Sequence, residues 1–116
     1  MSVDISYQHT PVLQHEVIQF LDPLPGQNYI DCTVGGGGHA QSILERTSPG
    51  GMLIGIDIDP RAISESRKAL HKFGKRVRLV NESYVNLKEI VRSEGVEIVH
   101  GILLDLIDHP YFQRLR

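Results

Sequence analysis

The chain of 116 residues is long enough for one domain with a single hydrophobic core, and its 41% hydrophobic and 22% charged residues are typical of a globular protein. No apolar run is long enough to cross a bilayer, and the N-terminus lacks the basic start and apolar stretch of a signal peptide. The net charge of −2 excludes a strong general affinity for polyanions, and the single cysteine, Cys32, excludes an internal disulfide and suits the cytoplasm.

The first predicted element is a helix from about Pro11 to Leu21, capped by Thr10 and ended by the prolines and glycine of "DPLPGQ". Strands and helices then alternate. The predicted strands span about 28–34, 52–57, 76–80 and 97–106, and the predicted helices span about 39–46, 60–73 and 86–95. Asp59 and Pro60 begin the second of these helices, and Gly74 ends it.

This alternation, with short connections, predicts a parallel sheet with right-handed crossovers. The first strand is expected in the centre, with the second and third strands on one side and the fourth on the other. Such a sheet is the first half of a doubly wound, Rossmann-like α/β fold. Ligands of this fold bind at the carboxyl ends of the strands, where the strand order reverses.

Four consecutive glycines, at residues 35–38, lie between the first strand and the next helix. Gly35, Gly37 and Ala40 satisfy the pattern G-x-G-x-x-A in the strand–loop–helix context that a nucleotide site requires. A loop without side chains turns tightly and lets a ligand approach the backbone. We therefore expect a nucleoside-bearing cofactor at this loop.

Three acidic residues end or lie within the predicted strands and help to choose the cofactor. Asp57 follows Gly35 by 22 positions, close to the spacing of a carboxylate that binds ribose hydroxyls. Asp31 and Asp105 place further carboxylates at the same rim, where they would repel a pyrophosphate and attract a cationic sulfonium. This favours S-adenosylmethionine over a dinucleotide, although each carboxylate can also simply cap a strand end.

Seven of the twelve basic residues fall within positions 61–78, and two interpretations remain open for them. They form either the solvated face of a helix or a patch that faces nucleic acid. These residues are Arg61, Arg67, Lys68, Lys72, Lys75, Arg76 and Arg78.

The segments "HTPVL", "DCTVGGGGHA", "GIDIDPRAI" and "GILLDL" together resemble the bacterial S-adenosylmethionine-dependent methyltransferases that modify the exocyclic N4 of a cytidine in 16S, small-subunit ribosomal RNA. The resemblance runs from about His9 to Leu106. It implies a cytoplasmic enzyme with a class I methyltransferase core and an inserted helical domain. Residues 1–106 would be the N-terminal half of that core.

By the same resemblance, six positions are expected to contact the cofactor. Gly37, Gly38 and His39 would contact it from the glycine loop. Asp57 would hold the ribose, Tyr84 would lie against the adenine, and Asp105 would close the methionine end of the site. The sequence identifies no catalytic residue with certainty and no metal-ligand pattern.

The last residues, 107–116, depart from the family. "DHPY" loosely resembles the D-P-P-Y loop of amino-group methyltransferases. The segment "IDHPYFQRLR" more closely resembles a short helical segment near the start of HD-domain phosphohydrolases, without the histidine and aspartate metal ligands of that chemistry. We therefore expect a helical tail and a fused, shuffled or truncated chain.

If residues 97–106 were the last strand, they would form a long, apolar and unprotected edge. Such an edge pairs readily with another chain, so we expect a homo-oligomer built through this strand or the tail. Three functions remain open: an active ribosomal RNA methyltransferase, an inactive half-domain that still binds the cofactor, and an oligomer that binds no ligand.

Overall fold

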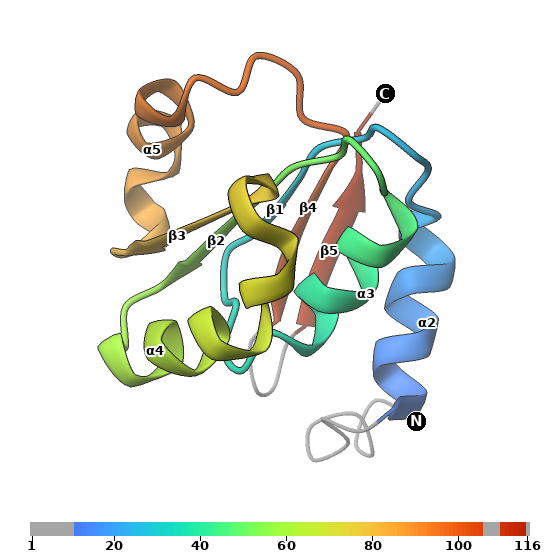
Figure 1. Ribbon diagram of the computed structural model, residues 1–116, viewed down its shortest axis with the longest axis horizontal. Coiled ribbons are helices and arrows are strands. Elements are labelled where there is room, and N and C mark those ends of the chain that lie inside the picture. Colours follow the sequence, from blue (N-terminus) through green and yellow to red (C-terminus); the bar gives the residue numbers. More distant parts are fainter. Residues whose placement is uncertain (1–10, 106–109, 116) are drawn as a thin grey trace.

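The computed structural model describes residues 11–105 and 110–115 (Figure 1). Its helices and strands are, in chain order, α2 (Pro11–Leu21), β1 (Tyr29–Asp31), α3 (Gly38–Arg46), β2 (Leu53–Asp57), α4 (Pro60–Ala69), β3 (Val77–Asn81), α5 (Leu87–Glu94), β4 (Gly101–Asp105) and β5 (Pro110–Arg114). Two 3₁₀ helices, η1 (His71–Arg76) and η2 (Tyr84–Asn86), flank β3.

The strands form one sheet in the order β3-β2-β1-β4-β5. The pairs among the first four strands are all parallel, and β1 is central, with β2 and β3 on one side and β4 on the other. In this register Asp31 of β1 lies between Gly55 of β2 and Leu103 of β4. The predicted strand order and Rossmann-like fold class are therefore confirmed.

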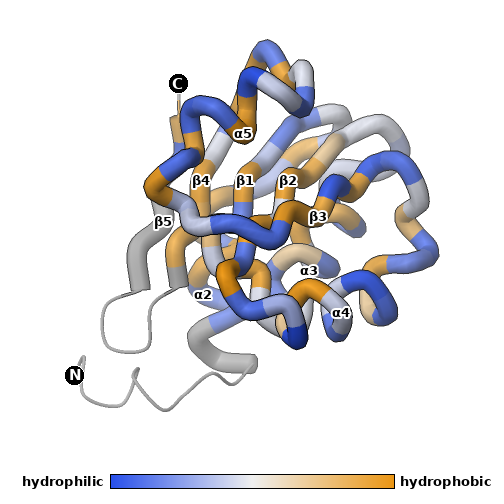
Figure 2. Tube along the Cα trace, turned by 90° about the vertical axis from the view of Figure 1, so that its left-hand side faces the viewer, coloured by the Kyte–Doolittle hydropathy of each residue, from blue (hydrophilic) through white to orange (hydrophobic). Residues whose placement is uncertain are grey.

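Helices cover both faces of this sheet, which Figure 2 shows between α5 on one side and α2, α3 and α4 on the other. Successive side chains of a strand point to opposite faces, so each strand contributes side chains to the core on both faces of the sheet. The core beneath α2, α3 and α4 includes Val17, Leu21, Tyr29, Ile43, Leu44, Leu53, Ile63 and Leu70. The core beneath α5 includes Ile30, Cys32, Ile54, Ile56 and Ile90.

Helix α4 is shorter than the sequence predicts. It ends at Ala69 instead of Phe73, and the chain continues as η1. Gly74 lies inside η1 with φ 58°, a left-handed conformation that glycine adopts without steric cost. The chain turns toward the start of β3 at Gly74, the residue that the sequence predicts as the stop.

Arg76 joins η1 to the turn between α3 and β2. Its Nε donates to the carbonyl oxygen of Gly51 at 2.7 Å, and its guanidinium also donates to the carbonyl of Leu44 and the hydroxyl of Ser48. Gly51 has no room for a side chain, because an added Cβ would overlap Thr47 and the carbonyl oxygen of Gln27. This residue of the basic cluster is therefore structural.

The prediction of a helical tail is wrong for the described part of residues 107–116. Residues 110–114 form strand β5, which pairs antiparallel with β4 from Asp105↔Pro110 to Gly101↔Arg114. The open edge of β4 offers a row of unpaired backbone groups, and pairing with it outweighs the helical tendency of a short segment. Local sequence gives no sign of this neighbour.

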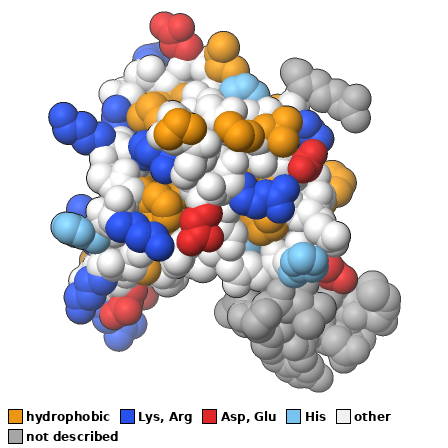
Figure 3. Space-filling view, turned by 45° about the vertical axis from the view of Figure 1, so that its right-hand side comes forward, with side chains coloured by type: hydrophobic (Ala, Val, Ile, Leu, Met, Phe, Trp, Pro, Cys, Tyr) orange, Lys and Arg blue, Asp and Glu red, His pale blue; other side chains and the backbone are white. Residues whose placement is uncertain are grey.

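The expected edge position of β4 is wrong for the same reason, since β4 lies between β1 and β5. Its backbone groups are paired within the chain, which removes the argument for a homo-oligomer through an exposed β4. The outer strand β5 has five residues and ends near Arg114, whose guanidinium lies 3.9 Å from Asp22. Figure 3 shows basic and acidic side chains mixed over the face it draws. Within residues 11–105 and 110–115, no helix is long and apolar enough to span a membrane.

Candidate functional site

A cavity of about 200 Å³ lies where the first three strands end. Its lining residues come from the segments that directly follow β1, β2 and β3: Cys32, Thr33, Asp57, Ile58, Glu82, Ser83 and Tyr84. The carboxyl ends of parallel strands are where ligands of doubly wound sheets bind. The cavity is smaller than the roughly 300–1,000 Å³ of sites that enclose a whole drug-sized ligand, so it suits one part of a larger molecule.

The glycine loop borders this cavity with an open backbone. Gly35 and Gly37 have φ 53° and 92°, which only glycine adopts readily. A Cβ on Gly37 would contact Leu70 at 3.4 Å, so that side of the loop packs on α4. A Cβ on Gly36 would have no atom within 4 Å, so the other side is open to a ligand.

Asp57 links the cavity to the glycine loop. Its Oδ2 accepts the backbone N–H of Gly35 at 3.0 Å, and its Oδ1 accepts the N–H of Asp59 at 3.0 Å. As the sequence predicts, Asp59 caps α4, and its Oδ1 accepts the N–H of Arg61 at 2.9 Å. Asp57 therefore builds the turn as well. Each oxygen of an ionised carboxylate has a second lone pair, so both can still accept a ligand hydroxyl.

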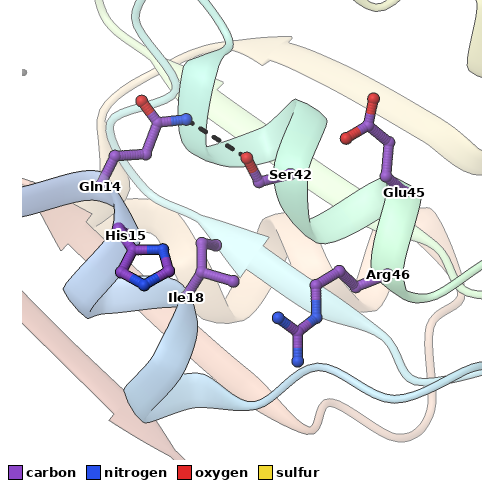
Figure 4. A pocket seen from close by; sticks show the side chains of 6 residues that line it. All are labelled: Gln14, His15, Ile18, Ser42, Glu45 and Arg46. Carbon is purple, nitrogen blue, oxygen red and sulfur yellow. Dashed lines mark hydrogen bonds between the residues drawn. The ribbon is translucent and has the colours of Figure 1, made fainter. Parts of the chain in front are cut away.

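Two other side chains hold the loop from the helices. Ser66 of α4 is fully buried and its hydroxyl donates to the carbonyl oxygen of Gly35. Gln14 of α2 donates through Nε2 to the carbonyl of Gly38 at 2.8 Å and to the hydroxyl of Ser42 at 3.3 Å. Figure 4 shows the second of these bonds between α2 and α3. Side chains of β2 and α4 thus hold the glycine loop at Gly35, and a side chain of α2 holds the start of α3.

Ser66→Ala is expected to lower the free energy of unfolding by about 1–2 kcal/mol, because the Gly35 carbonyl loses its donor in a partly buried place. Ser64→Ala, on the exposed face of the same helix, is the matched control and should change stability by less than about 0.5 kcal/mol. Urea unfolding measures both. Equal effects of the two substitutions would show that the Ser66 hydrogen bond does not stabilise the loop.

A second cavity, of about 310 Å³, lies between α2 and α3 and is shown in Figure 4. Its lining residues are Gln14, His15, Ile18, Ser42, Glu45 and Arg46. It is larger than the cavity at the strand ends, but it lies on the helical layer and Asp57 and Tyr84 do not line it. Arg46 is already paired with Asp22 at 3.3 Å. The strand-end cavity is therefore the better candidate site.

The structure brings two of the sequence-predicted site residues, Asp57 and Tyr84, to the strand-end cavity. The other predicted contacts lie elsewhere on the same rim: Gly37 caps α3, and Gly38 and His39 begin it. Asp105 ends β4. Gly37, Gly38 and His39 do not line the cavity.

Asp31 is not at the surface of the site. It is only 1% exposed within β1, and its Oδ1 accepts the N–H of Thr33 at 3.1 Å. Since neighbouring side chains of a strand point to opposite faces, Asp31 and the cavity-lining Cys32 face different layers.

The sequence analysis missed the other five lining residues, which are Cys32, Thr33, Ile58, Glu82 and Ser83. Ile58 is 73% exposed, an unusual position for isoleucine, and Tyr84 is 39% exposed beside it. An apolar residue directly after the strand-ending Asp57 was the available signal. Together Ile58 and Tyr84 offer exposed apolar surface that a flat ring would cover.

Cys32 is buried, and this burial, with the neighbouring Asp31 carboxylate as a smaller cause, raises the pKa of its thiol to about 11. At neutral pH the thiol is therefore protonated and a poor nucleophile. Cys32 contributes a small apolar wall to the cavity rather than covalent chemistry.

The raised pKa of Cys32 predicts that the protein loses stability in alkali. The unfolded thiol, with a pKa of 9.0, ionises before the folded one, so the stabilisation is complete below pH 9 and is lost by about pH 11. The full loss amounts to about 3 kcal/mol. Urea unfolding at pH 8 and pH 10.5 should show about 2 kcal/mol of this loss, because the folded thiol is only partly ionised at pH 10.5. Burial also raises the pKa of Tyr29, so a Cys32→Ala variant should keep only a smaller alkaline loss. An unchanged loss in that variant would contradict the assignment.

Residues 6–109 match the sequence profile of the MraW methylase family. Over 102 residues the chain is 49% identical to "Ribosomal RNA small subunit methyltransferase H" of Dehalococcoides mccartyi, which covers 88% of this chain and 29% of that protein. The chain spans about a third of the length of the curated relatives it matches.

Two solved structures share the fold at low sequence identity. TrmN from Thermus thermophilus matches with a TM-score of 0.65 and 20% identity, over 85% of this chain and 30% of that chain. A SAM-dependent O-methyltransferase from Thermotoga maritima matches with a TM-score of 0.63 and 19% identity, over 86% of this chain and 38% of that chain. The fold is therefore that of the Rossmann-like class I methyltransferases.

Proposed function

Because the chain belongs to the MraW methylase family, we propose that it binds S-adenosylmethionine at the ends of β1, β2 and β3 and serves the methylation of small-subunit ribosomal RNA in the cytoplasm. The observation that carries this proposal is the position of Asp57. One carboxylate borders the strand-end cavity and also holds the open glycine loop. A ligand that extends from the cavity to the loop would contact both.

The residues at this rim suit the proposed cofactor. S-adenosylmethionine carries its methyl group on a sulfonium, so that the neutral thioether S-adenosylhomocysteine would be a good leaving group. The Asp57 carboxylate has lone pairs left for the two ribose hydroxyls, and Ile58 and Tyr84 offer apolar surface for the adenine. Gly36 leaves open space beside the loop. Negative charge from Asp57 and Glu82 favours a cationic ligand.

The roles of the remaining predicted residues follow from the family resemblance. Gly37, Gly38 and His39 would contact the methionine part, and Asp105 would close that end of the site. The finer proposal is that the methyl acceptor is the N4 amino group of a cytidine. Its lone pair is delocalised into the ring, so a hydrogen-bond acceptor such as Asp105 would help to localise it. Most of the rate enhancement would come from positioning and the exclusion of water.

Two measurements test this proposal separately. Calorimetric titration with S-adenosylhomocysteine should give saturable binding, and incubation with labelled S-adenosylmethionine and small-subunit RNA should label one cytidine at N4. Binding without transfer would support the cofactor site and overturn catalysis by this chain. Absence of binding would overturn the proposal as a whole. Label at another atom would overturn the N4 assignment only.

A further inference from the structure

The basic residues of positions 61–78 separate into two groups in the structure. Four have partners within the described part of the chain: Arg61 with Asp59 at 3.6 Å, Lys72 with Glu45 at 3.7 Å, Arg78 with Glu94 at 3.1 Å, and Arg76 with the backbone carbonyl of Gly51 at 2.7 Å. The other three, Arg67, Lys68 and Lys75, are exposed, and no described carboxylate lies within ion-pair distance of any of them. Their charge is available to a partner.

Arg67 and Lys68 line an open depression of about 540 Å³ together with Ser64 and His71. We call the site formed by these four residues the basic depression. The residues are three or four positions apart, so they share one exposed face of α4 and the start of η1. The acidic residue nearest in sequence, Glu65, does not line it. All the polar groups that line the depression therefore can donate hydrogen bonds.

A smaller cavity of about 220 Å³ adjoins the basic depression and shares Arg67 and His71 with it. Its other lining residues, Leu70, Gly74, Val77 and Leu79, give it a largely apolar floor, and we call it the apolar cavity. Positive charge and an apolar floor thus lie side by side. A nucleotide offers the matching pair of groups, a phosphate and a flat base.

We propose that the basic depression and the apolar cavity bind a single-stranded segment of the RNA substrate, with phosphates on Arg67 and Lys68 and one unpaired base against His71. This inference rests on the proposed function. Arginine, lysine and serine are common phosphate ligands, and unstacked bases of single-stranded RNA pack on aromatic rings and guanidinium planes. Because the net charge of the chain is −2, RNA would be attracted by a local positive surface such as this one rather than by the protein as a whole.

The position on α4 suits such a contact. The helix begins at Pro60, directly after the turn that Asp57 and Asp59 build at the rim. Arg67 lies seven residues further, about 10 Å along the helix axis. An RNA that presents a base at the rim would therefore extend along α4 by about this distance to reach the basic depression.

The test is binding of a fluorescently labelled 12-nucleotide single-stranded RNA, followed by anisotropy from 50 to 200 mM salt. The double variant Arg67→Gln/Lys68→Gln should weaken binding about tenfold at 50 mM salt. Its salt slope should fall by about 1.4, since each lost phosphate contact on a single strand contributes about 0.7. Loss of affinity without a change of slope would overturn the phosphate contacts.

The matched control is Lys88→Gln/Arg92→Gln, which removes the same charge from α5 on the opposite face of the sheet. It should change RNA affinity less than twofold. An equal loss in both double variants would show that only net charge matters and would overturn the site. Equal displacement of the RNA by polyglutamate of the same charge would overturn it as an RNA surface.

His71 is tested by a pair of variants. His71→Ala should weaken binding about fivefold through loss of base stacking, whereas His71→Phe keeps a flat ring and should stay within twofold of the original chain. Equal weakening by both would overturn the base contact. Titration with S-adenosylhomocysteine should be unchanged in every variant. Normal cofactor binding with no RNA binding would overturn this inference alone, whereas absent cofactor binding would overturn the proposed function.

Discussion

Asp57→Ala is expected to weaken S-adenosylhomocysteine binding by about two to four orders of magnitude. Two hydrogen bonds from ribose hydroxyls to a charged carboxylate contribute about 1.5 to 3 kcal/mol each, and about 1.4 kcal/mol corresponds to tenfold. The substitution also removes the acceptor of the Gly35 N–H, which loosens the loop beside the cavity. Calorimetry measures the affinity, and urea unfolding measures the accompanying loss of stability.

Asp59→Ala is the matched control, because it removes a carboxylate two residues away that caps α4 and does not line the cavity. It should cost about 1 kcal/mol of stability and leave the affinity within about threefold. Asp57→Asn separates the two roles, since the amide keeps the shape but replaces one acceptor by a donor. Equal affinities of the Asp57→Ala and Asp59→Ala variants would refute the ribose assignment.

Gly51→Ala is expected to destabilise the fold by about 3 kcal/mol, the upper end of the usual cost of overpacking. An added Cβ would overlap the Thr47 side chain and the backbone carbonyl of Gln27, and a backbone carbonyl cannot turn away as a flexible side chain does. The Gly51 carbonyl also receives the Arg76 guanidinium, so displacement of this turn disturbs that contact. The midpoint of urea unfolding measures the effect.

The neighbouring glycine provides the control. A Cβ on Gly50 would meet no atom within 4 Å, and Gly50 is exposed. Gly50→Ala should therefore stay within about 0.5 kcal/mol of the original stability. If both alanine variants unfold at the same urea concentration, the close approach at Gly51 is not what restricts this position.

The parallel core was predictable because its signals are local. Asp59 and Pro60 mark the start of α4, and a glycine marks the end of α5. The apolar runs mark the strands. The alternation of these elements then determines the strand order. Strand β5 was not predictable in this way, since its conformation depends on a partner strand rather than on its own residues. The early end of α4 likewise depends on where β3 must begin.

The candidate site likewise has features that local sequence predicts and features that depend on distant parts of the chain. Asp57 was predictable because it ends a strand, and the ends of parallel strands meet at one edge of the sheet. Tyr84 was expected only from the family resemblance, and it also lines the cavity. Asp31 was expected at the rim but is buried, because β1 is the central strand and helices cover both faces of the sheet. The separation of the basic cluster into paired and unpaired residues depends on acids far away in sequence, such as Glu45 and Glu94.

The central place of β1 has a kinetic consequence. Asn28 and Met52, at the starts of β1 and β2, are 24 residues apart and share a hydrogen bond, whereas Asn28 and His100, before β1 and β4, are 72 residues apart. Closing the longer loop costs about 1 kcal/mol more in chain entropy. We expect β4 to dock after the β1–β2–β3 ladder, so Leu103→Ala should mainly speed unfolding and Ile54→Val should mainly slow refolding in stopped-flow traces. The reverse pattern would place β4 in the folding nucleus.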